Sequence, residues 1–351
     1  MVDFIALPKA EVHIHVEGCI EAGEVVDNCE TAGIALRRPR ESLFEAHDLK
    51  SFLEMLDWIC GTFRTPDQLA HTAYKLAQRL AKSGVRYADV IVNPTHWRHW
   101  RRNIPGMIEA FDNGFAAAEK DGFPPVGLCV SLLRTQSEAE AIELVELLVK
   151  IRHPRVVALS IDGNEAAAGR TGPRFADAFR RAAAAGLRRT VHAGESSGPE
   201  GVRDALELLG ADRIDHGVRA IEDPALVNLL AERQIPLGIC PVSNLTLGLY
   251  SSLAEHPIDR LRKAGVAVSI NTDDPALLGT TLEDSYAQCA AAFAWDGDII
   301  RQLAATSIQA SYAEPSVKAR LMEELAAWQA ELPARRVHRP RPSVRAVNND
   351  E

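Results

Sequence analysis

The chain has 351 residues, of which 46% are hydrophobic and 25% charged, the composition of an ordinary soluble globular protein. Its formal net charge of −9 argues against nucleic acid as a partner, because proteins that bind this polyanion usually present a basic surface. No apolar run approaches the length of a membrane span, and no signal peptide is recognisable. Six scattered cysteines without a C-x-x-C pair indicate reduced thiols, so we expect a cytoplasmic protein.

The first predicted strand covers residues 10–16, within the sequence EVHIHVEG. Its apolar and polar residues alternate, and His13 and His15 fall on the same parity, so both imidazoles point to one face. A single buried histidine is more often a hydrogen-bonded core residue than a ligand. Two on one face, followed by Glu17 and the turn-forming Gly18, favour a metal site.

Residues 21–84 form a mostly helical segment that is longer than one crossover connection needs. Within it, residues 42–63 carry large apolar side chains at helical spacing, which is typical of a core helix or of a lid over a barrel mouth. We assign this apolar stripe no chemistry, and we predict that residues 21–84 are a helical insertion or lid.

From residue 85 onward, β-branched apolar runs alternate with alanine-rich helical patterns, which predicts parallel strands joined by helical crossovers. Together with the first strand they make eight units, so we predict an α/β fold, a (β/α)8 TIM barrel with extra helices after the first strand. A doubly wound sheet would alternate similarly, but the chain lacks a G-x-G-x-x-G motif after a first strand and a P-loop. Further strands are expected near residues 85–92, 126–132, 156–161, 188–192, 212–215, 236–240 and 266–271, and helices at 138–151, 172–186, 200–210 and 224–234.

We expect this barrel to form a single domain over residues 1–332. The remaining residues, 333–351, carry five arginines among prolines without apolar periodicity. A basic run of this length is more often a solvated tail than a nucleic-acid arm, so we predict a disordered tail. The sequence gives no indication of the oligomeric state.

Ionisable residues gather at the predicted C-terminal ends of the strands, where a barrel of this type places its catalytic groups. Each has a structural alternative when taken alone: the aspartates could cap a helix, and a histidine could pack in the core. Together they are hard to explain by packing, because such groups are costly to bury unpaired, and they predict a functional site. These residues are His13, His15, His192, Glu195, Asp215, His216, Asp273 and Asp274.

Three imidazoles and a carboxylate suit zinc with one open position for water. Zinc would make hydroxide available near neutral pH, and Glu195 and His216 are placed by topology to serve as acid and base. Other zinc sites fit less well: the P-C-x-x-C of cytidine deaminases is absent, and so is H-E-x-x-H. A two-metal barrel would typically need a lysine at the end of the fourth strand, which reads LSIDGNE, so one metal is favoured.

Five segments in order, LPKAEVHIHVEG, VHAGE, RIDHGVR, CPVSN and NTDDP, together resemble the adenosine/adenine deaminase family of metal-dependent hydrolases. The resemblance extends from residue 7 to about residue 328. It implies a (β/α)8 barrel with one zinc ion that hydrolyses the 6-amino group of a small-molecule purine and releases ammonia. By motif match, the implied zinc ligands are His13, His15, His192 and Asp273.

The resemblance also implies roles around the purine. Glu195 would protonate N1, and His216 would orient and deprotonate the zinc water. Asp274 would meet N7, and the backbone of Gly163 would meet N3. His15 and Glu17 are further residues that the resemblance places at the substrate.

Three departures concern the choice of substrate. Glu17 stands where the adenosine subgroup usually has Asp, and Cys19 replaces a small residue nearby. The segment DGNE at 162–165 is two residues shorter than in the nucleoside enzymes and matches the length found in the adenine branch, whereas DDPALLGTTLEDSY resembles the nucleoside branch. We expect adenosine or a related nucleoside as substrate. The alternatives are adenine, a modified aminopurine, or a purine-binding module that lost turnover, although every acid, base and ligand residue is present.

Overall fold

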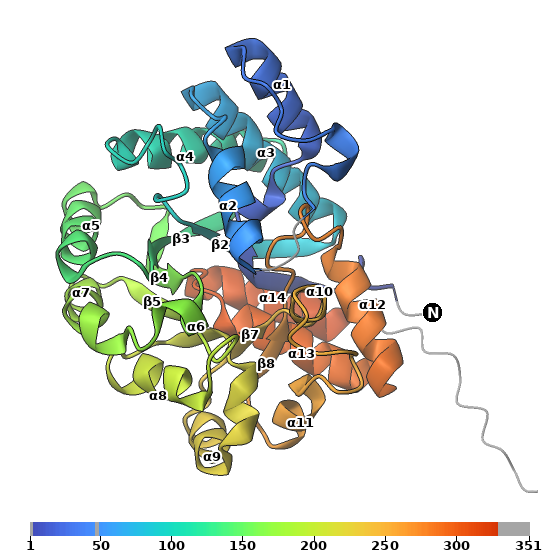
Figure 1. Cartoon of the computed structure of the whole chain (residues 1–351). Helices are drawn as coiled ribbons and strands as arrows, with labels where there is room; N and C mark the ends of the chain where they lie inside the picture. The colour runs from blue at the N-terminus through green and yellow to red at the C-terminus, as the bar shows by residue number, and fades with distance from the viewer. Residues whose placement is uncertain (1–2, 46–48, 329–351) are drawn as a thin grey trace, which may run out of the picture.

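The computed structural model describes residues 3–45 and 49–328. Eight parallel strands follow one another in sequence order, with helices around them (Figure 1). Every predicted strand is present, and the predicted (β/α)8 barrel is confirmed. The strands are β1 (Lys9–His15), β2 (Val85–Val92), β3 (Val126–Leu133), β4 (Val156–Asp162), β5 (Arg188–Ala193), β6 (Arg213–His216), β7 (Leu237–Ile239) and β8 (Val268–Ile270).

The barrel closes between β1 and the segment after β8. The backbone N–H of His15 donates to the carbonyl of Asp273 at 2.9 Å, and the N–H of Asp273 donates to the carbonyl of His13 at 3.1 Å. Ile14 and Asp273 thereby form a parallel bridge. This closure places Asp273 directly beside the two histidines of the first strand.

The helices predicted at 138–151, 172–186, 200–210 and 224–234 are all confirmed, with ends within three residues. The helices that follow the strands or lie in the long connections are α3 (Pro66–Lys82), α4 (Ile104–Lys120), α5 (Glu138–Ile151), α7 (Gly172–Ala184), α8 (Pro199–Glu207), α9 (Pro224–Arg233), α11 (Ile258–Lys263) and α13 (Gly297–Ala310). The additional helices are α1 (Ala22–Ala32), α2 (Leu49–Cys60), α6 (Glu165–Ala168), α10 (Pro241–Thr246), α12 (Leu282–Phe293) and α14 (Pro315–Ala327).

Local sequence explains where α3 begins and ends. Thr65 and Gln68 exchange side-chain hydrogen bonds with each other's backbone N–H, and Pro66 occupies the first turn. After the helix, Gly84 has a φ of 75°, and a Cβ there would lie 1.9 Å from the carbonyl oxygen of Ile5. Only glycine fits at this turn, which leads directly into β2.

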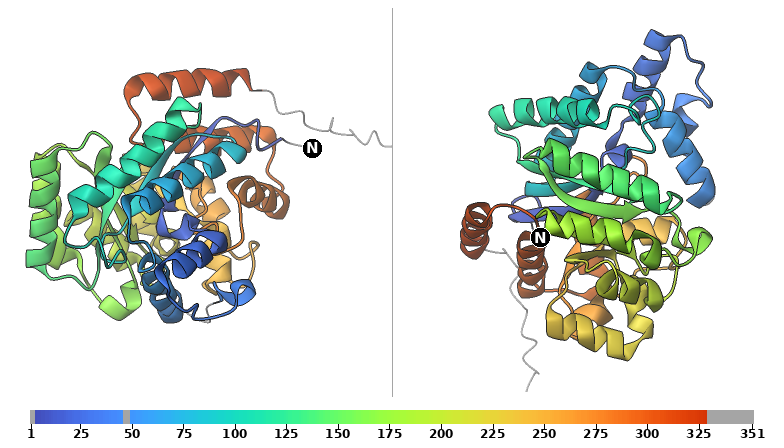
Figure 2. Two further views of the ribbon diagram at one scale, coloured as in Figure 1. Left: turned by 90° about the horizontal axis from the view of Figure 1, so that it is seen from above. Right: turned by 90° about the vertical axis from the view of Figure 1, so that its left-hand side faces the viewer.

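The extra helices α1 and α2 precede α3 within the predicted insertion. Phe52 and Leu56 of α2 are buried, and α14 lies at the opposite end of the barrel from α2 (Figure 2).

Near the closure of the barrel, α13 packs on β1, where Ser307 accepts a hydrogen bond from the backbone N–H of Ala10 at 3.0 Å. Among the helices in residues 3–45 and 49–328, none has the length and hydropathy that a bilayer span requires.

Candidate active site

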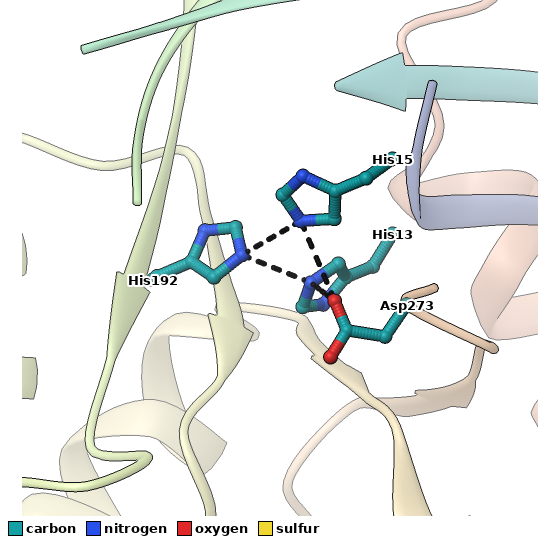
Figure 3. A group of neighbouring side chains, drawn as sticks. All are labelled: His13, His15, His192 and Asp273. Carbon is teal, nitrogen blue, oxygen red and sulfur yellow. Dashed lines mark hydrogen bonds and ion pairs between the residues drawn. The ribbon is translucent and has the colours of Figure 1, made fainter. Parts of the chain in front are cut away.

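Four side chains from three parts of the barrel converge at the C-terminal ends of the strands (Figure 3). The Nε2 atom of His192 lies 3.1 Å from Nε2 of both His13 and His15. The Oδ1 atom of Asp273 lies 3.2 Å from Nε2 of His13 and 3.4 Å from Nε2 of His15. The predicted four-residue cluster is therefore assembled in the structure.

The chemistry of this donor set fits a metal ion. With metal–nitrogen bonds of about 2.0–2.1 Å, the ligand atoms of a tetrahedral zinc site lie about 3.3 Å from one another, close to the separations of 3.1–3.4 Å found here. The Nδ1–H of His13 donates to the carbonyl of Gly238 at 2.9 Å, which leaves Nε2 to face the cluster. The Oδ2 atom of Asp273 accepts a hydrogen bond from the hydroxyl of Ser243 at 2.7 Å, which leaves Oδ1 to face the cluster as well.

Charge within the cluster is strongly coupled. Burial would lower the pKa of His13, but Asp273 and Asp215 outweigh it and raise this pKa to about 9. Burial would likewise raise the pKa of Asp273, but His13 holds it well below its usual range. Burial and the neighbouring His13 keep the pKa of His192 well below its ordinary value, so that imidazole is neutral. A metal ion bound here would displace the proton of His13.

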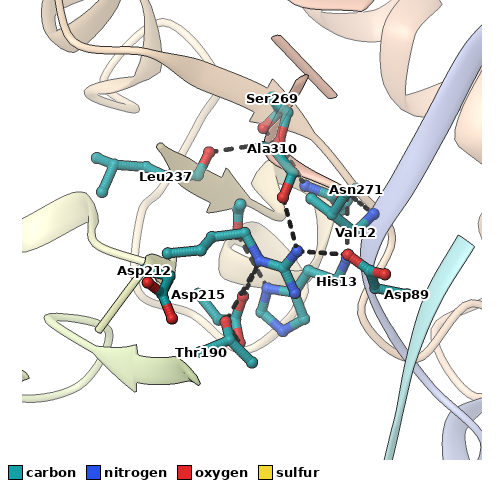
Figure 4. Close-up of polar contacts among 12 residues, drawn as sticks. Val12, His13, Asp89, Thr190, Asp212, Asp215, Leu237, Ser269, Asn271 and Ala310 are labelled. Carbon is teal, nitrogen blue, oxygen red and sulfur yellow. Dashed lines mark hydrogen bonds and ion pairs between the residues drawn. The ribbon is translucent and has the colours of Figure 1, made fainter. Parts of the chain in front are cut away.

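A network inside the barrel supports the cluster from below (Figure 4). The Nδ1 atom of His192 lies 3.6 Å from Oδ2 of Asp215, a fully buried carboxylate that also accepts a hydrogen bond from Thr190 at 2.6 Å. The buried guanidinium of Arg213 donates to Asp215 at 3.3 Å and to Asp89 at 2.6 Å. Arg213 thereby gives hydrogen-bonded ion-pair partners to two buried carboxyl groups beneath the cluster.

Two residues of the site adopt a left-handed backbone conformation, which is uncommon for residues other than glycine. The φ angle is 66° at His216 and 68° at Asp273. Such conformations cost free energy and cluster at functional sites, where the surrounding structure enforces them. At Asp273 the enforcing contacts are the two backbone hydrogen bonds to β1 that close the barrel.

Glu195 and His216 lie next to the cluster, as the sequence predicted. The Oε1 atom of Glu195 is 3.4 Å from Nε2 of His216, and His216 Nε2 is 3.9 Å from Oδ2 of Asp273. Burial, together with Asp273 and Glu165, raises the pKa of Glu195 to about 8. Burial, together with His13, lowers the pKa of His216 to about 3. At neutral pH the carboxyl therefore carries a proton and the imidazole is neutral.

Asp274 is the second buried acid of the site. Burial, followed by the charges of Asp273 and Glu17, raises its pKa well above the usual range, so it too can donate a hydrogen bond. Gly18 packs against it: a Cβ at Gly18 would lie 2.4 Å from Cα of Asp274. The backbone of the turn after β1 and the NTDDP segment can approach this closely because residue 18 has no side chain.

A cavity of about 60 Å³ joins these groups. Three apolar side chains of α2 form one wall, and Asp162 and Gly163 at the end of β4 form another. The predicted site residues His15, His192, Glu195, His216, Gly163, Asp273 and Asp274 line this cavity, together with Phe52, Leu53, Leu56, His96, Asp162 and Leu247.

Glu17 does not line the cavity. Its Oε1 atom accepts hydrogen bonds from the backbone N–H of Asn93 at 2.8 Å and from Nε1 of Trp97 at 2.6 Å. Its Oε2 atom is buried and finds no hydrogen-bond partner among the described residues. The predicted substrate residue thus holds the loop after β2, with one oxygen still unpaired.

Sequence reasoning missed Glu165, which organises the turn after β5. Its carboxylate accepts backbone N–H hydrogen bonds from Gly194 at 3.1 Å, Glu195 at 3.0 Å and Ser197 at 3.3 Å. Arg134 lies 3.7 Å from this carboxylate and donates to the carbonyl of His192. The segment DGNE indicates this position of Glu165, because an acid that follows the end of a strand by three residues lies at the rim of the barrel.

Comparisons with known proteins agree over almost the entire chain. A family model described as adenosine deaminase matches residues 8–328. An adenine deaminase of Rhodospirillum rubrum is 35% identical over 332 residues, which covers 92% of this chain and 97% of that protein. An adenosine deaminase of Serratia proteamaculans is 37% identical over 290 residues, covering 80% and 86%. An aminodeoxyfutalosine deaminase of Streptomyces avermitilis is 35% identical over 346 residues, covering 93% and 94%.

Solved structures give the same result. The crystal structure of an adenine deaminase from Arthrobacter aurescens superposes with a TM-score of 0.87 at 31% identity, covering 92% of this chain and 99% of that chain. An amidohydrolase from Burkholderia ambifaria with bound Zn superposes with a TM-score of 0.85 at 28% identity, covering 92% and 90%. The relatives that are named as deaminases differ in their named substrates but share one reaction, deamination. The chain belongs to the adenosine deaminase family within the amidohydrolase superfamily, and it is a hydrolytic deaminase of an aminopurine.

Proposed function

We propose that this protein is a zinc-dependent deaminase of 6-aminopurine nucleosides, with adenosine as the simplest substrate and the 6-oxopurine nucleoside and ammonia as products. One observation carries the proposal: a convergent His3Asp cluster lies beside Glu195, a buried acid with a raised pKa, and His216, a buried imidazole with a lowered pKa. The nitrogen-rich donor set favours zinc over harder cations, and we propose one ion per chain. The Burkholderia relative with bound Zn supports that choice.

The side chains divide the chemistry between them. Zinc held by His13, His15, His192 and Asp273 would lower the pKa of water to about 7 and so supply a nucleophile at neutral pH. Glu195 would give its proton to N1 of the purine, which breaks the ring conjugation and makes C6 susceptible to attack. His216 would orient the attacking oxygen on the other side of the reacting carbon.

Two further contacts would hold the base. Protonated Asp274 can donate a hydrogen bond to N7, which is an acceptor only. The backbone N–H of Gly163 would meet N3 from the end of β4. These groups and Glu195 together account for the three ring nitrogens of the base that do not carry the substituent.

An unpaired acceptor in the cavity wall favours a nucleoside. The Oδ1 atom of Asp162 accepts a hydrogen bond from the amide of Asn93 at 2.5 Å, whereas its buried Oδ2 has no partner among the described residues. The Oε2 atom of Glu17 also has no partner among the described residues, but Glu17 does not line the cavity, and burial raises its pKa. A hydroxyl group of a sugar at N9 is a donor that could satisfy the unpaired oxygen of Asp162, and a buried unpaired acceptor is costly.

Two further proposals concern the domain organisation and the cellular location of the protein. We propose that residues 1–332 form one domain and that residues 21–84 serve as its lid, because α2 supplies Phe52, Leu53 and Leu56 to the cavity wall. We propose a cytoplasmic location, which the six buried and unpaired cysteines support. The predicted disordered tail at 333–351 lies outside the described residues.

The test is a comparison of kcat/KM for the zinc-loaded protein on adenosine, deoxyadenosine, adenine and aminodeoxyfutalosine. We expect adenosine-type nucleosides to exceed adenine by at least tenfold, since a site built for sugar hydroxyls leaves polar groups unpaired when the sugar is missing. Glu17→Ala and Asp162→Asn should each reduce this preference. Fastest turnover of adenine would contradict the nucleoside proposal, and purine binding without turnover of any compound would indicate a binding module.

A further inference from the structure

A buried chain of hydrogen bonds leads from the segment before α11 to His216. The backbone N–H of Ile258 donates to Nδ1 of His256 at 3.2 Å. The Nε2 atom of His256 lies 3.1 Å from Oδ1 of Asn244, and Nδ2 of Asn244 lies 3.3 Å from Nδ1 of His216. His256, Asn244 and His216 are each at most 1% exposed, so bulk solvent does not compete for these hydrogen bonds.

The direction of every bond in this chain follows from its first donor. A backbone N–H can only donate, so Nδ1 of His256 is an acceptor and its proton sits on Nε2. That Nε2–H donates to the carbonyl oxygen of the Asn244 amide, which turns the NH2 group toward His216. Nδ1 of His216 therefore accepts, and the proton of the neutral imidazole sits on its Nε2.

We propose that His256 is a positioning residue for deamination, which acts through Asn244 to hold His216 as the Nε2–H tautomer. This inference rests on the proposed function and assigns roles to two residues, 244 and 256, that do not line the cavity. Nε2 of His216 faces Glu195 at 3.4 Å and Asp273 at 3.9 Å, the region where the attacking oxygen would lie. In this tautomer Nε2 has no lone pair for a proton, so His216 orients and stabilises that oxygen by donating a hydrogen bond rather than by deprotonating it.

The opposite tautomer has no support in this network. If the proton sat on Nδ1 of His216, it would face the NH2 group of Asn244, and two donors would oppose each other in a buried site. The amide cannot turn over to relieve this conflict, because its NH2 group would then oppose the Nε2–H of His256. The backbone of Ile258 thus determines the proton position on a catalytic imidazole two side chains away.

The decisive variant is Asn244→Asp, which keeps the shape of the side chain but replaces its donor by an acceptor. A carboxylate at this position accepts from both neighbours and draws the proton of His216 onto Nδ1. We expect kcat on adenosine to fall at least 100-fold, while KM changes less than threefold and zinc content is retained, because a wrong histidine tautomer disables a catalytic site without dismantling it.

The tautomer itself can be observed in the zinc-loaded protein by 15N NMR with labelled histidine, in which protonated and unprotonated ring nitrogens have distinct shifts. The resonances of His216 are identified by their loss in His216→Gln. We expect the proton on Nε2 in the native protein and on Nδ1 in Asn244→Asp. This readout does not require turnover, so it separates the tautomer assignment from the proposed reaction.

Variants at residue 256 supply the second test. His256→Ala leaves the Asn244 amide free to turn and should lower kcat about 10- to 100-fold, the usual range for a residue that orients a site residue. His256→Gln restores an N–H donor toward Asn244 and should recover most of this loss. His153 offers a matched control, because its Nδ1 also accepts the N–H of the residue two positions later, Arg155, at 3.2 Å but far from the cavity; His153→Gln should retain native kcat.

The outcomes of these experiments distinguish failure of the tautomer assignment from failure of the proposed function. Native kcat in Asn244→Asp, equal loss in His256→Ala and His256→Gln, or a proton on Nδ1 of His216 in the native protein would each overturn the inference. The native protein could turn over no purine while His216 still carries its proton on Nε2 in the native protein and on Nδ1 in Asn244→Asp. In that case the proton assignment stands and the proposed function fails. If Asn244→Asp does not fold, the pair of His256 variants decides.

Discussion

Glu195 and His216 face each other across the candidate active site, with Oε1 of the glutamate 3.4 Å from Nε2 of the histidine. Burial disfavours the charged form of both groups, so the pKa of Glu195 rises to about 8 while that of His216 falls to about 3. The two residues therefore hold an acidic proton and a neutral imidazole at pH 7. This is the protonation state that attack on a purine protonated at N1 requires.

The role of Glu195 can be isolated by Glu195→Gln. An amide has nearly the same shape but cannot deliver a proton to N1, so we expect kcat to fall by about 10²- to 10⁴-fold. Zinc content measured by elemental analysis should stay at the native level. Glu232→Gln, an exposed change on α9, is the matched control and should leave kcat unchanged. Loss of metal in Glu195→Gln would make this residue a ligand and contradict its assignment as the acid.

The metal ligands are tested by metal content. His13→Ala and Asp273→Ala each remove one of four converging donors, and we expect the purified variants to retain less than a tenth of the native zinc. The native protein should hold one ion per chain. His153→Ala, remote from the cluster, should retain full zinc and shows whether losing any histidine affects the measurement. Two ions per native chain, or full zinc content in both ligand variants, would contradict the proposed site.

The turn after β5 depends on Glu165. Its carboxylate accepts three backbone N–H hydrogen bonds from residues 194, 195 and 197, at 3.0–3.3 Å. Glu165→Gln replaces one acceptor by a donor, so the turn that carries Glu195 should shift. We expect kcat to fall about 10- to 100-fold with zinc retained, as is usual for residues that orient a site. A native kcat would show that the turn holds its shape without this carboxylate.

Acid stability should reflect the buried His256. Burial and the nearby Arg260 lower its folded pKa from 6.5 to about 4. Between these values the unfolded chain binds a proton that the folded protein does not, so the free energy of unfolding decreases as pH falls from 6.5 to 4. At pH 5 this loss is about 2 kcal/mol for one such histidine. Urea unfolding at pH 7 and pH 5 should show a smaller acid loss in His256→Gln than in the native protein, whereas equal losses would contradict the expected pKa.

Much of the fold could be predicted because the relevant signals are local. All eight strands could be predicted from short runs of residues between helical patterns. The predicted strand ends then indicated which ionisable residues lie together. Predicted strand 236–240 is longer than β7, Leu237–Ile239, because Pro236 cannot donate to the ladder and Cys240 is the N-cap of α10.

The features of the site that could not be predicted from the sequence depend on contacts between distant segments. The left-handed conformation of Asp273 arises from its hydrogen bonds with β1, some 260 residues earlier in the chain. Glu17 turns toward Trp97 and Asn93 because those residues lie over it in three dimensions, and no local pattern contains that information. The connection from His256 to His216 likewise joins separate loops.

We propose that this site hydrolyses the 6-amino group of a purine nucleoside with the help of one bound metal. The most direct measurement is the release of ammonia from adenosine by the zinc-loaded protein, followed together with the change in ultraviolet absorbance from the 6-amino to the 6-oxopurine. We predict equal amounts of ammonia and 6-oxopurine nucleoside from the native protein, and neither from Glu195→Gln at the same zinc content. Saturable binding of adenosine and of the other aminopurines by the native protein, without ammonia from any of them, would show that the site does not catalyse deamination.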